Sequence, residues 1–140
     1  MSPFLSSLII EMASTLLKLD TVWSKLVKER AGYKCEVCGK TNQTVRLNSH
    51  HIIGRRNKTT RWDLRNGVCL CVTHHKFGLQ SAHEDSPWFD DWLEEYRPKD
   101  LEYVNSIKNV ITKWKEYQRK ELLEEFKLKL KEYEEGSNLS

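Results

Sequence analysis

Two pairs of potential metal ligands constrain this 140-residue chain more than any other feature of its sequence. Cys35 and Cys38 form a CxxC pair followed by glycine, and Cys71 and His74 form a second pair with the same spacing. A tight turn with two residues between its ligands directs both side chains to one ion, and four such ligands complete the tetrahedral set of structural zinc. We therefore predict a structural zinc ion that ties the two pairs together.

A redox role for the CxxC pair is the alternative to zinc. It requires a strand–helix–strand context, which the sequence near Cys35 lacks. Cys69 lies two residues before Cys71 on a predicted strand, and we expect its thiol to lie in the core rather than on the ion.

The sequence shows no targeting or membrane-spanning segment. Residues 1–19 lack an early positive charge and are interrupted by Glu11, so we expect no signal peptide. No apolar run approaches the roughly 20 residues that a membrane span needs. We therefore expect a cytoplasmic protein with no membrane partner, in a reducing compartment where paired cysteines more often bind metal.

Positive charge is concentrated in the middle of the chain, although the net charge is only +3. Residues 21–80 hold 12 Lys or Arg and 3 Asp or Glu, whereas the rest of the chain holds 11 and 17. All 5 histidines and all 4 cysteines lie in or just beyond the same region. A basic centre is typical of a site for a polyanion such as a nucleic acid, and a solvated charged face is the alternative.

The hydrophobic pattern predicts an α+β fold with a small core and helical extensions at both ends. Asp20 or Thr21 is a candidate cap between two N-terminal helices, and Asn66-Gly67 is a strong turn signal before the second strand. The predicted helices cover residues 8–19, 22–30, a segment beginning near 72, 88–93 and 99–134, and the predicted strands cover 45–53 and 68–71, with a basic loop at 54–61. This gives an N-terminal helical segment at 1–30, a central domain at 31–97 and a C-terminal helical extension at 98–140.

Three of these segments leave alternatives open. The first helix either packs on the core or forms a dispensable leader. Trp88, Phe89 and Trp92 are expected to fill the back of the core rather than to stack on bases, because the two adjacent aspartates would repel DNA. The apolar stripe of residues 99–134 is longer than a small core requires, so that it either folds back or pairs with another subunit.

Three histidines remain for chemistry once His74 is assigned to zinc, namely His50, His51 and His75. Adjacent residues of a strand point to opposite faces, so His50 and His51 cannot easily share one task. A helix likewise turns His75 away from His74. Core histidines without a chemical role are the alternative, but five histidines around one basic pair of strands argue against it.

At these residues the sequence resembles the HNH endonuclease family, which has a ββα-metal fold. The matching segments are CEVCG at 35–39, SHHIIGRR at 49–56, DLRNGVCLC at 63–71 and VTHHKFG at 72–78, in the order and spacing of the family. The wider sequence looks like that of the small HNH proteins of phages and prophages. The resemblance implies a ββα-metal core with a zinc knuckle, and a phage protein would act in the cytoplasm of its bacterial host.

The resemblance also implies roles for individual residues. The residue before the central histidine of the motif, here His50, binds the catalytic divalent metal, and the last histidine, here His75, is a second ligand. The central histidine, here His51, is the general base that takes a proton from water. Asn66 would hold the loop and orient this base through its side-chain amide. The zinc knuckle of the family falls on Cys35, Cys38, Cys71 and His74.

The sequence departs from the commonest family pattern at three positions. His74 stands where a fourth cysteine is more usual, so an exchange of roles between His74 and His75 is an open alternative. His50 replaces a frequent aspartate, which favours ions that accept nitrogen, such as Mn²⁺, Ni²⁺ or Zn²⁺, beside Mg²⁺. His83 is additional, and it is either a third ligand of the catalytic metal or a surface residue.

The resemblance implies an enzyme that hydrolyses phosphodiester bonds in double-stranded DNA. A neutral histidine accepts a proton near pH 7, and a divalent ion stabilises the negative charge that develops on the leaving oxygen. Arg55, four residues after His51, is the cation expected nearest to the cleaved phosphate. The cations expected to bind backbone phosphates are Arg55, Arg56, Lys58, Arg61 and Arg65.

Two alternatives to an enzyme are open. One is a zinc-stabilised DNA-binding or phage packaging accessory protein, which would need the zinc ligands but not His51. The other is an interaction protein, either a homodimer or a binder of a partner protein, that acts through the C-terminal helix.

Overall fold

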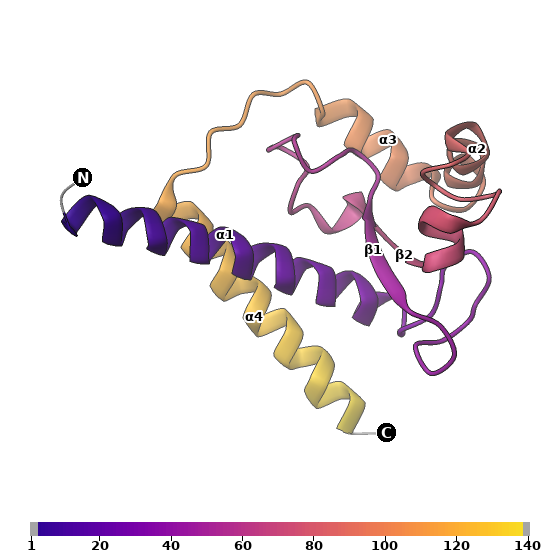
Figure 1. Cartoon of the computed structure of the whole chain (residues 1–140), viewed down its shortest axis with the longest axis horizontal. Helices are drawn as coiled ribbons and strands as arrows, with labels where there is room; N and C mark the ends of the chain where they lie inside the picture. The colour runs from indigo at the N-terminus through magenta and orange to yellow at the C-terminus, as the bar shows by residue number, and fades with distance from the viewer. Residues whose placement is uncertain (1–2, 139–140) are drawn as a thin grey trace.

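The computed structural model describes residues 3–138, which form a mixed α+β fold (Figure 1). In chain order the elements are α1 (Pro3–Arg30), β1 (Leu47–His51), the 3-10 helix η1 (Leu64–Asn66), β2 (Gly67–Cys71), the single π-helical turn η2 (Thr73–Phe77), α2 (Ser86–Tyr96), α3 (Pro98–Ile107) and α4 (Glu116–Asn138). Within the described range, every helix is too short or too polar to traverse a lipid bilayer.

The predicted boundary between two N-terminal helices is wrong, because α1 continues through residues 20 and 21. The hydroxyl of Thr21 donates to the carbonyl of Leu17 one turn earlier, which satisfies this side chain inside a helix. The carboxylate of Asp20 accepts hydrogen bonds from Arg61 and Trp62 instead of capping backbone N–H groups. Partners distant in the sequence therefore replace the local capping role that the sequence suggested.

The core lies between α1 and the sheet. Every residue of β2 is buried. Phe89 of α2 is also buried, and Trp88 and Trp92 pack against the core as predicted. On α1, four residues spaced to share one helical face are at most 1% exposed, namely Leu19, Trp23, Leu26 and Val27.

The two strands pair antiparallel, with His50 opposite Val68. β1 is shorter than predicted at both ends. Before it, the amide of Val45 closes a turn in the preceding loop. After it, the amide of Ile53 donates to the side chain of Asn66 at 2.7 Å. The residues predicted at the two ends of β1 therefore form loop hydrogen bonds instead of strand pairs. β2 begins one residue earlier than predicted.

The C-terminal region forms two helices rather than the single predicted one. Between them, residues 108–115 leave the helical path and cross the basic loop. The indole N–H of Trp114 donates to the carbonyl of Lys58 at 2.9 Å, and the hydroxyls of Thr59 and Thr112 are 2.7 Å apart. These tertiary hydrogen bonds replace helical ones in this segment.

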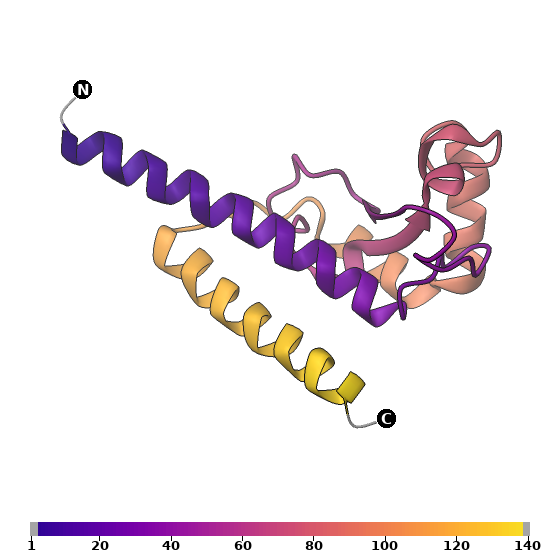
Figure 2. The same cartoon turned by 60° about the horizontal axis from the view of Figure 1, so that its bottom comes forward.

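α4 folds back along the second half of α1, as Figures 1 and 2 show. Leu123 and Phe126 of α4 are buried, and the hydroxyl of Thr15 donates to the carboxylate of Glu116 at 2.9 Å. The apolar stripe of the C-terminal region therefore packs within the same chain. The first half of α1 extends beyond α4 and exposes large apolar side chains, namely Phe4, Leu8, Ile9, Ile10 and Met12.

Replacement of Gly67 by alanine is expected to destabilise the fold by about 1–3 kcal/mol, the usual cost of overpacking a core. A Cβ atom there would overlap a side-chain carbon of Val27 and lie 2.9 Å from the indole of Trp23, and both side chains are buried. Gly54→Ala is the matched control, because nothing lies within 4 Å of a Cβ atom at that position. Urea unfolding of the two variants measures the difference, and equal stabilities would contradict this packing.

Candidate functional site

The four predicted zinc ligands come together in the structure. Their ligand atoms, from Cys35, Cys38, Cys71 and His74, all lie within 4.8 Å of one another. The sulfur atoms of Cys38 and Cys71 are 3.9 Å apart, and Nδ1 of His74 lies 3.3 Å from the sulfur of Cys71. Tetrahedral zinc with bonds of about 2.3 Å to sulfur and 2.0 Å to nitrogen separates its ligands by about 3.5–3.8 Å. The cluster therefore has the size and chemistry to hold a zinc ion.

The turn that carries the first cysteine pair depends on the glycine that follows it. Gly39 has φ +76°, a left-handed conformation that favours glycine. Its amide donates to the carbonyl of Cys35 at 2.8 Å, which closes the CxxC turn. Glu36, between the cysteines, exchanges two hydrogen bonds with the backbone of Cys69. The local sequence CEVCG thus both shapes the turn and attaches it to β2.

Cys69 itself is buried and is not one of the four clustered ligands, as the sequence predicted. Burial, followed by the nearby carboxylate of Glu36, raises the pKa of its thiol to about 12. Cys69 is therefore a neutral core thiol at pH 7.

A second cluster is formed by His50 on β1, His75 on η2 and His83 in the following loop. One ring nitrogen of each lies within 4.8 Å of the others. His83 is exposed, as in the alternative of a surface residue, but its Nε2 lies 3.1 Å from Nε2 of His75, within reach of a shared ion. The amide of His83 also donates to the carbonyl of His75, which fixes the loop against η2.

The second cluster has the features expected of a divalent metal site. Burial, and then the neighbouring imidazoles, lower the pKa of His50 to about 3, and burial and His83 lower that of His75 to about 4. These rings are therefore neutral at pH 7, which is the form that binds metal. Two ligand nitrogens at about 2.1 Å from one ion stand about 3.0–3.4 Å apart, which fits the 3.1 Å contact. Nδ1 of His75 is buried without a hydrogen-bond partner among the described residues.

His51 points away from the three clustered histidines, as strand alternation predicted. Its imidazole stacks on the indole of Trp23, with ring centroids 3.9 Å apart and planes inclined by 12°. Nε2 of His51 lies 2.9 Å from the carbonyl oxygen of Arg61. A carbonyl only accepts, so this contact requires the proton on Nε2 and leaves the lone pair on Nδ1. Burial lowers the pKa of His51, which favours the neutral ring at pH 7.

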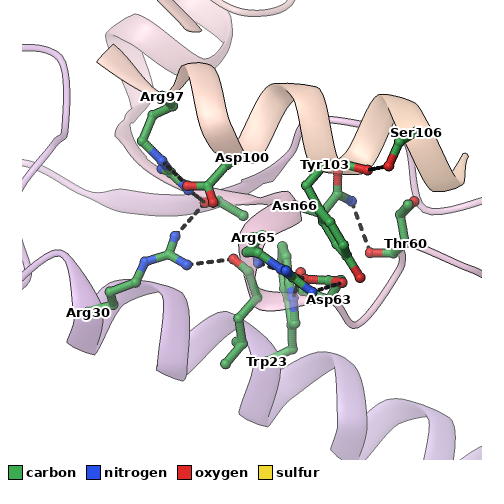
Figure 3. Close-up of polar contacts among 12 residues, drawn as sticks. Trp23, Arg30, Thr60, Asp63, Arg65, Asn66, Arg97, Asp100, Tyr103 and Ser106 are labelled. Carbon is green, nitrogen blue, oxygen red and sulfur yellow. Dashed lines mark hydrogen bonds and ion pairs between the residues drawn. The ribbon is translucent and has the colours of Figure 1, made fainter.

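Asn66 is fully buried, and its side-chain amide forms hydrogen bonds with backbone groups of the loop between the strands. Its Oδ1 accepts from the amide of Ile53 at 2.7 Å, and its Nδ2 donates to the carbonyl of Ile53 at 2.9 Å. Nδ2 also donates to the carbonyl of Thr60 at 3.1 Å (Figure 3). It makes no hydrogen bond to His51. Asn66 can therefore orient His51 only through the loop. It holds Thr60, and the following residue, Arg61, supplies the carbonyl that contacts Nε2 of His51.

The five cations predicted to bind phosphate do not gather at one place. Arg55 lines the same cleft as His50 and His51. The guanidinium of Arg61 forms two hydrogen bonds with the carboxylate of Asp20. The remaining three are Arg56, which is exposed, Lys58, which lies beside a separate pocket, and Arg65, which pairs with Asp63 and covers the ring of Tyr103.

Four of the five histidines line one open cleft of about 690 Å³. Its lining includes His50, His51, His75, His83 and Arg55. Two further lining residues, Asp20 and Trp23, come from α1, and sequence reasoning missed both. Asp20 carries the sequence signature of a helix cap and Trp23 that of a core residue, so no local signal could have assigned them to this cleft.

The class that the fold and clusters define is a mixed α+β protein with a Cys₃His cluster that could hold a metal such as zinc. No family model, curated protein or solved structure matches the chain.

Substitution of Cys38 by serine is expected to abolish zinc retention and lower the melting temperature, because structural zinc contributes on the order of 10 kcal/mol to folding. Cys69→Ala is the matched control, since it removes a thiol outside the cluster. Elemental analysis of purified protein gives the zinc content, and melting curves with and without a chelator give the stability. Zinc retention by Cys38→Ser equal to that of Cys69→Ala would contradict this ligand set.

Proposed function

We propose that the protein is a metal-dependent endonuclease of the HNH type that hydrolyses phosphodiester bonds in double-stranded DNA. One observation carries the proposal. Three clustered imidazoles share an open cleft with a fourth, His51, whose tautomer is set by a backbone carbonyl. A protein that only binds zinc at the Cys₃His cluster would not need these four histidines in an open cleft.

The arrangement of elements supports a ββα-metal core. The antiparallel strands β1 and β2 are followed by η2, and the second cluster joins the first strand to this helical turn through His50 and His75. The zinc cluster joins the end of β2 to the CxxC turn. In this proposal the helical element of the core is a single π-helical turn, continued by α2 after the loop that carries His83.

His50, His75 and His83 would hold the catalytic divalent ion. When bound, it supplies positive charge that stabilises the scissile phosphate and the leaving oxygen as negative charge develops. Three nitrogen ligands without a carboxylate suit Mn²⁺, Ni²⁺ or Zn²⁺ better than Mg²⁺. The depressed pKa values of His50 and His75 keep one ring nitrogen of each unprotonated and available to the ion at pH 7.

His51 would act as the general base. Its Nδ1 lone pair takes a proton from water while Nε2–H remains bonded to the Arg61 carbonyl, so the ring keeps one tautomer before proton transfer. Arg55 would bind a backbone phosphate at the cleft, a contact that positions DNA without reading its sequence. If the protein is encoded by a phage or prophage, the reaction takes place in the cytoplasm of the bacterial host.

Plasmid nicking tests the proposal. The wild-type protein is expected to convert supercoiled plasmid to the open-circular form with Mn²⁺, Ni²⁺ or Mg²⁺, and His51→Ala is expected to lose about 10²- to 10⁴-fold in rate, the usual contribution of a positioned base. Asn48→Ala, on the same strand but outside the cleft, is the matched control. Equal rates for wild type and His51→Ala, or no cleavage with any of these ions, would defeat the proposal in favour of a DNA-binding accessory protein.

Two arginine variants test where the DNA backbone lies. Arg55→Ala is expected to weaken binding of a duplex and to lower the salt slope by about one charge, because one phosphate contact is lost. Arg65→Ala is expected to leave the slope unchanged, since Arg65 is paired with Asp63 and covers Tyr103. Fluorescence anisotropy at several salt concentrations measures both slopes. An identical response of the two variants would place the DNA elsewhere.

A further inference from the structure

We propose that Trp23, on α1, is a positioning residue for the general base His51. The inference rests on the proposed function, but it concerns a residue outside the segment that resembles the HNH family. The indole is 1% exposed and lies flat against the imidazole, with centroids 3.9 Å apart and planes inclined by only 12°. It is the stacking partner of His51 and also lines the cleft.

The indole is itself held in place by a hydrogen bond. Its Nε1–H donates to the carbonyl of Asp63 at 3.0 Å, and both residues are drawn in Figure 3. Asp63 caps η1 by accepting from the amide of Arg65 at 2.9 Å. Trp23 therefore connects α1 to the turn that carries Asn66, and the plane of its ring cannot rotate without loss of a hydrogen bond.

A second residue of α1, Asp20, holds the residue whose carbonyl contacts Nε2 of His51. Asp20, one turn before Trp23, accepts two hydrogen bonds from Arg61 at 2.7 and 3.0 Å and one from Trp62 at 2.8 Å. The carbonyl of Arg61 is the group that faces Nε2 of His51. α1 thus sets the plane of the imidazole through Trp23 and the position of its hydrogen-bond acceptor through Asp20.

The two contacts restrict different motions of His51. A hydrogen bond at Nε2 fixes one point of the imidazole but still permits the ring to tilt about that point. A flat, rigid surface at 3.9 Å removes the tilt. The direction of the Nδ1 lone pair then follows from the two together. An aliphatic side chain of similar bulk would fill the core but would not define this plane.

Activity measurements separate this role from ordinary packing. Trp23→Leu is expected to lower kcat by about 10- to 100-fold with KM changed less than about 3-fold, since misplacement of a reacting group by about 1 Å costs up to 10²-fold. Trp23→Phe, which keeps a flat aromatic ring but loses the N–H and part of the ring area, is expected to recover most of this rate. Trp114→Leu is the control, because Trp114 also donates to a backbone carbonyl but makes no contact with the His51 ring.

A spectroscopic measurement tests the geometry without DNA or turnover. In ¹⁵N-labelled, zinc-loaded protein, His51 is expected to show the Nε2–H tautomer and ring protons shifted upfield by the indole, with the resonances assigned by comparison with His51→Gln. Trp23→Leu is expected to lose the upfield shift and to mix the tautomers, whereas Trp23→Phe and Trp114→Leu retain the wild-type pattern.

Three results would overturn the inference: wild-type kcat in Trp23→Leu, an equal loss of kcat in Trp114→Leu, or a His51 spectrum unaffected by Trp23→Leu. Failure of the proposed function is distinguishable from these. A wild-type protein that shows the expected His51 signature but cleaves no DNA would refute the nuclease and leave the positioning of the ring demonstrated.

Discussion

The rest of the cleft depends on the hydrogen bonds that the side-chain amide of Asn66 makes to the backbone. It is fully buried, and its three hydrogen bonds to backbone groups of residues 53 and 60 close the loop between the strands. Because a buried amide left unpaired costs more than an ordinary hydrogen bond provides, this closure is strongly enforced. The loop places the carbonyl of Arg61 2.9 Å from Nε2 of His51, so Asn66 acts on the tautomer of His51 without a hydrogen bond to its ring.

Two arginines, one on α1 and one at the junction of α2 and α3, hold the turn that carries Asn66. Arg30 of α1 donates to the carbonyls of Leu64 and Gly67, and Arg97, at the start of α3, also donates to Gly67 (Figure 3). Arg97 pairs with Glu36 inside the CxxC turn at 2.8 Å. The Cys₃His cluster, the sheet and the histidine cleft are therefore one connected unit, and residues outside the motif segments are part of it.

The sequence predicted the parts of this site that depend on local spacing. The two ligand pairs, the opposite directions of His50 and His51 and the buried position of Cys69 all follow from turn and strand geometry. It failed where a tertiary partner overrides a local preference. Asp20 pairs with Arg61 rather than capping a helix, and the cation that was expected to bind phosphate is thereby occupied. The stacking of Trp23 on His51 joins residues 28 positions apart, and no local pattern encodes it.

We propose that His50, His75 and His83 hold a divalent ion in the cleft beside His51. Anomalous diffraction from crystals soaked in Mn²⁺ tests it most directly, because the manganese and zinc edges distinguish the two ions. We expect a manganese peak bonded to one ring nitrogen of each of the three histidines and a zinc peak among Cys35, Cys38, Cys71 and His74. A zinc peak at the cysteines with no ion of any kind between the three histidines would contradict it.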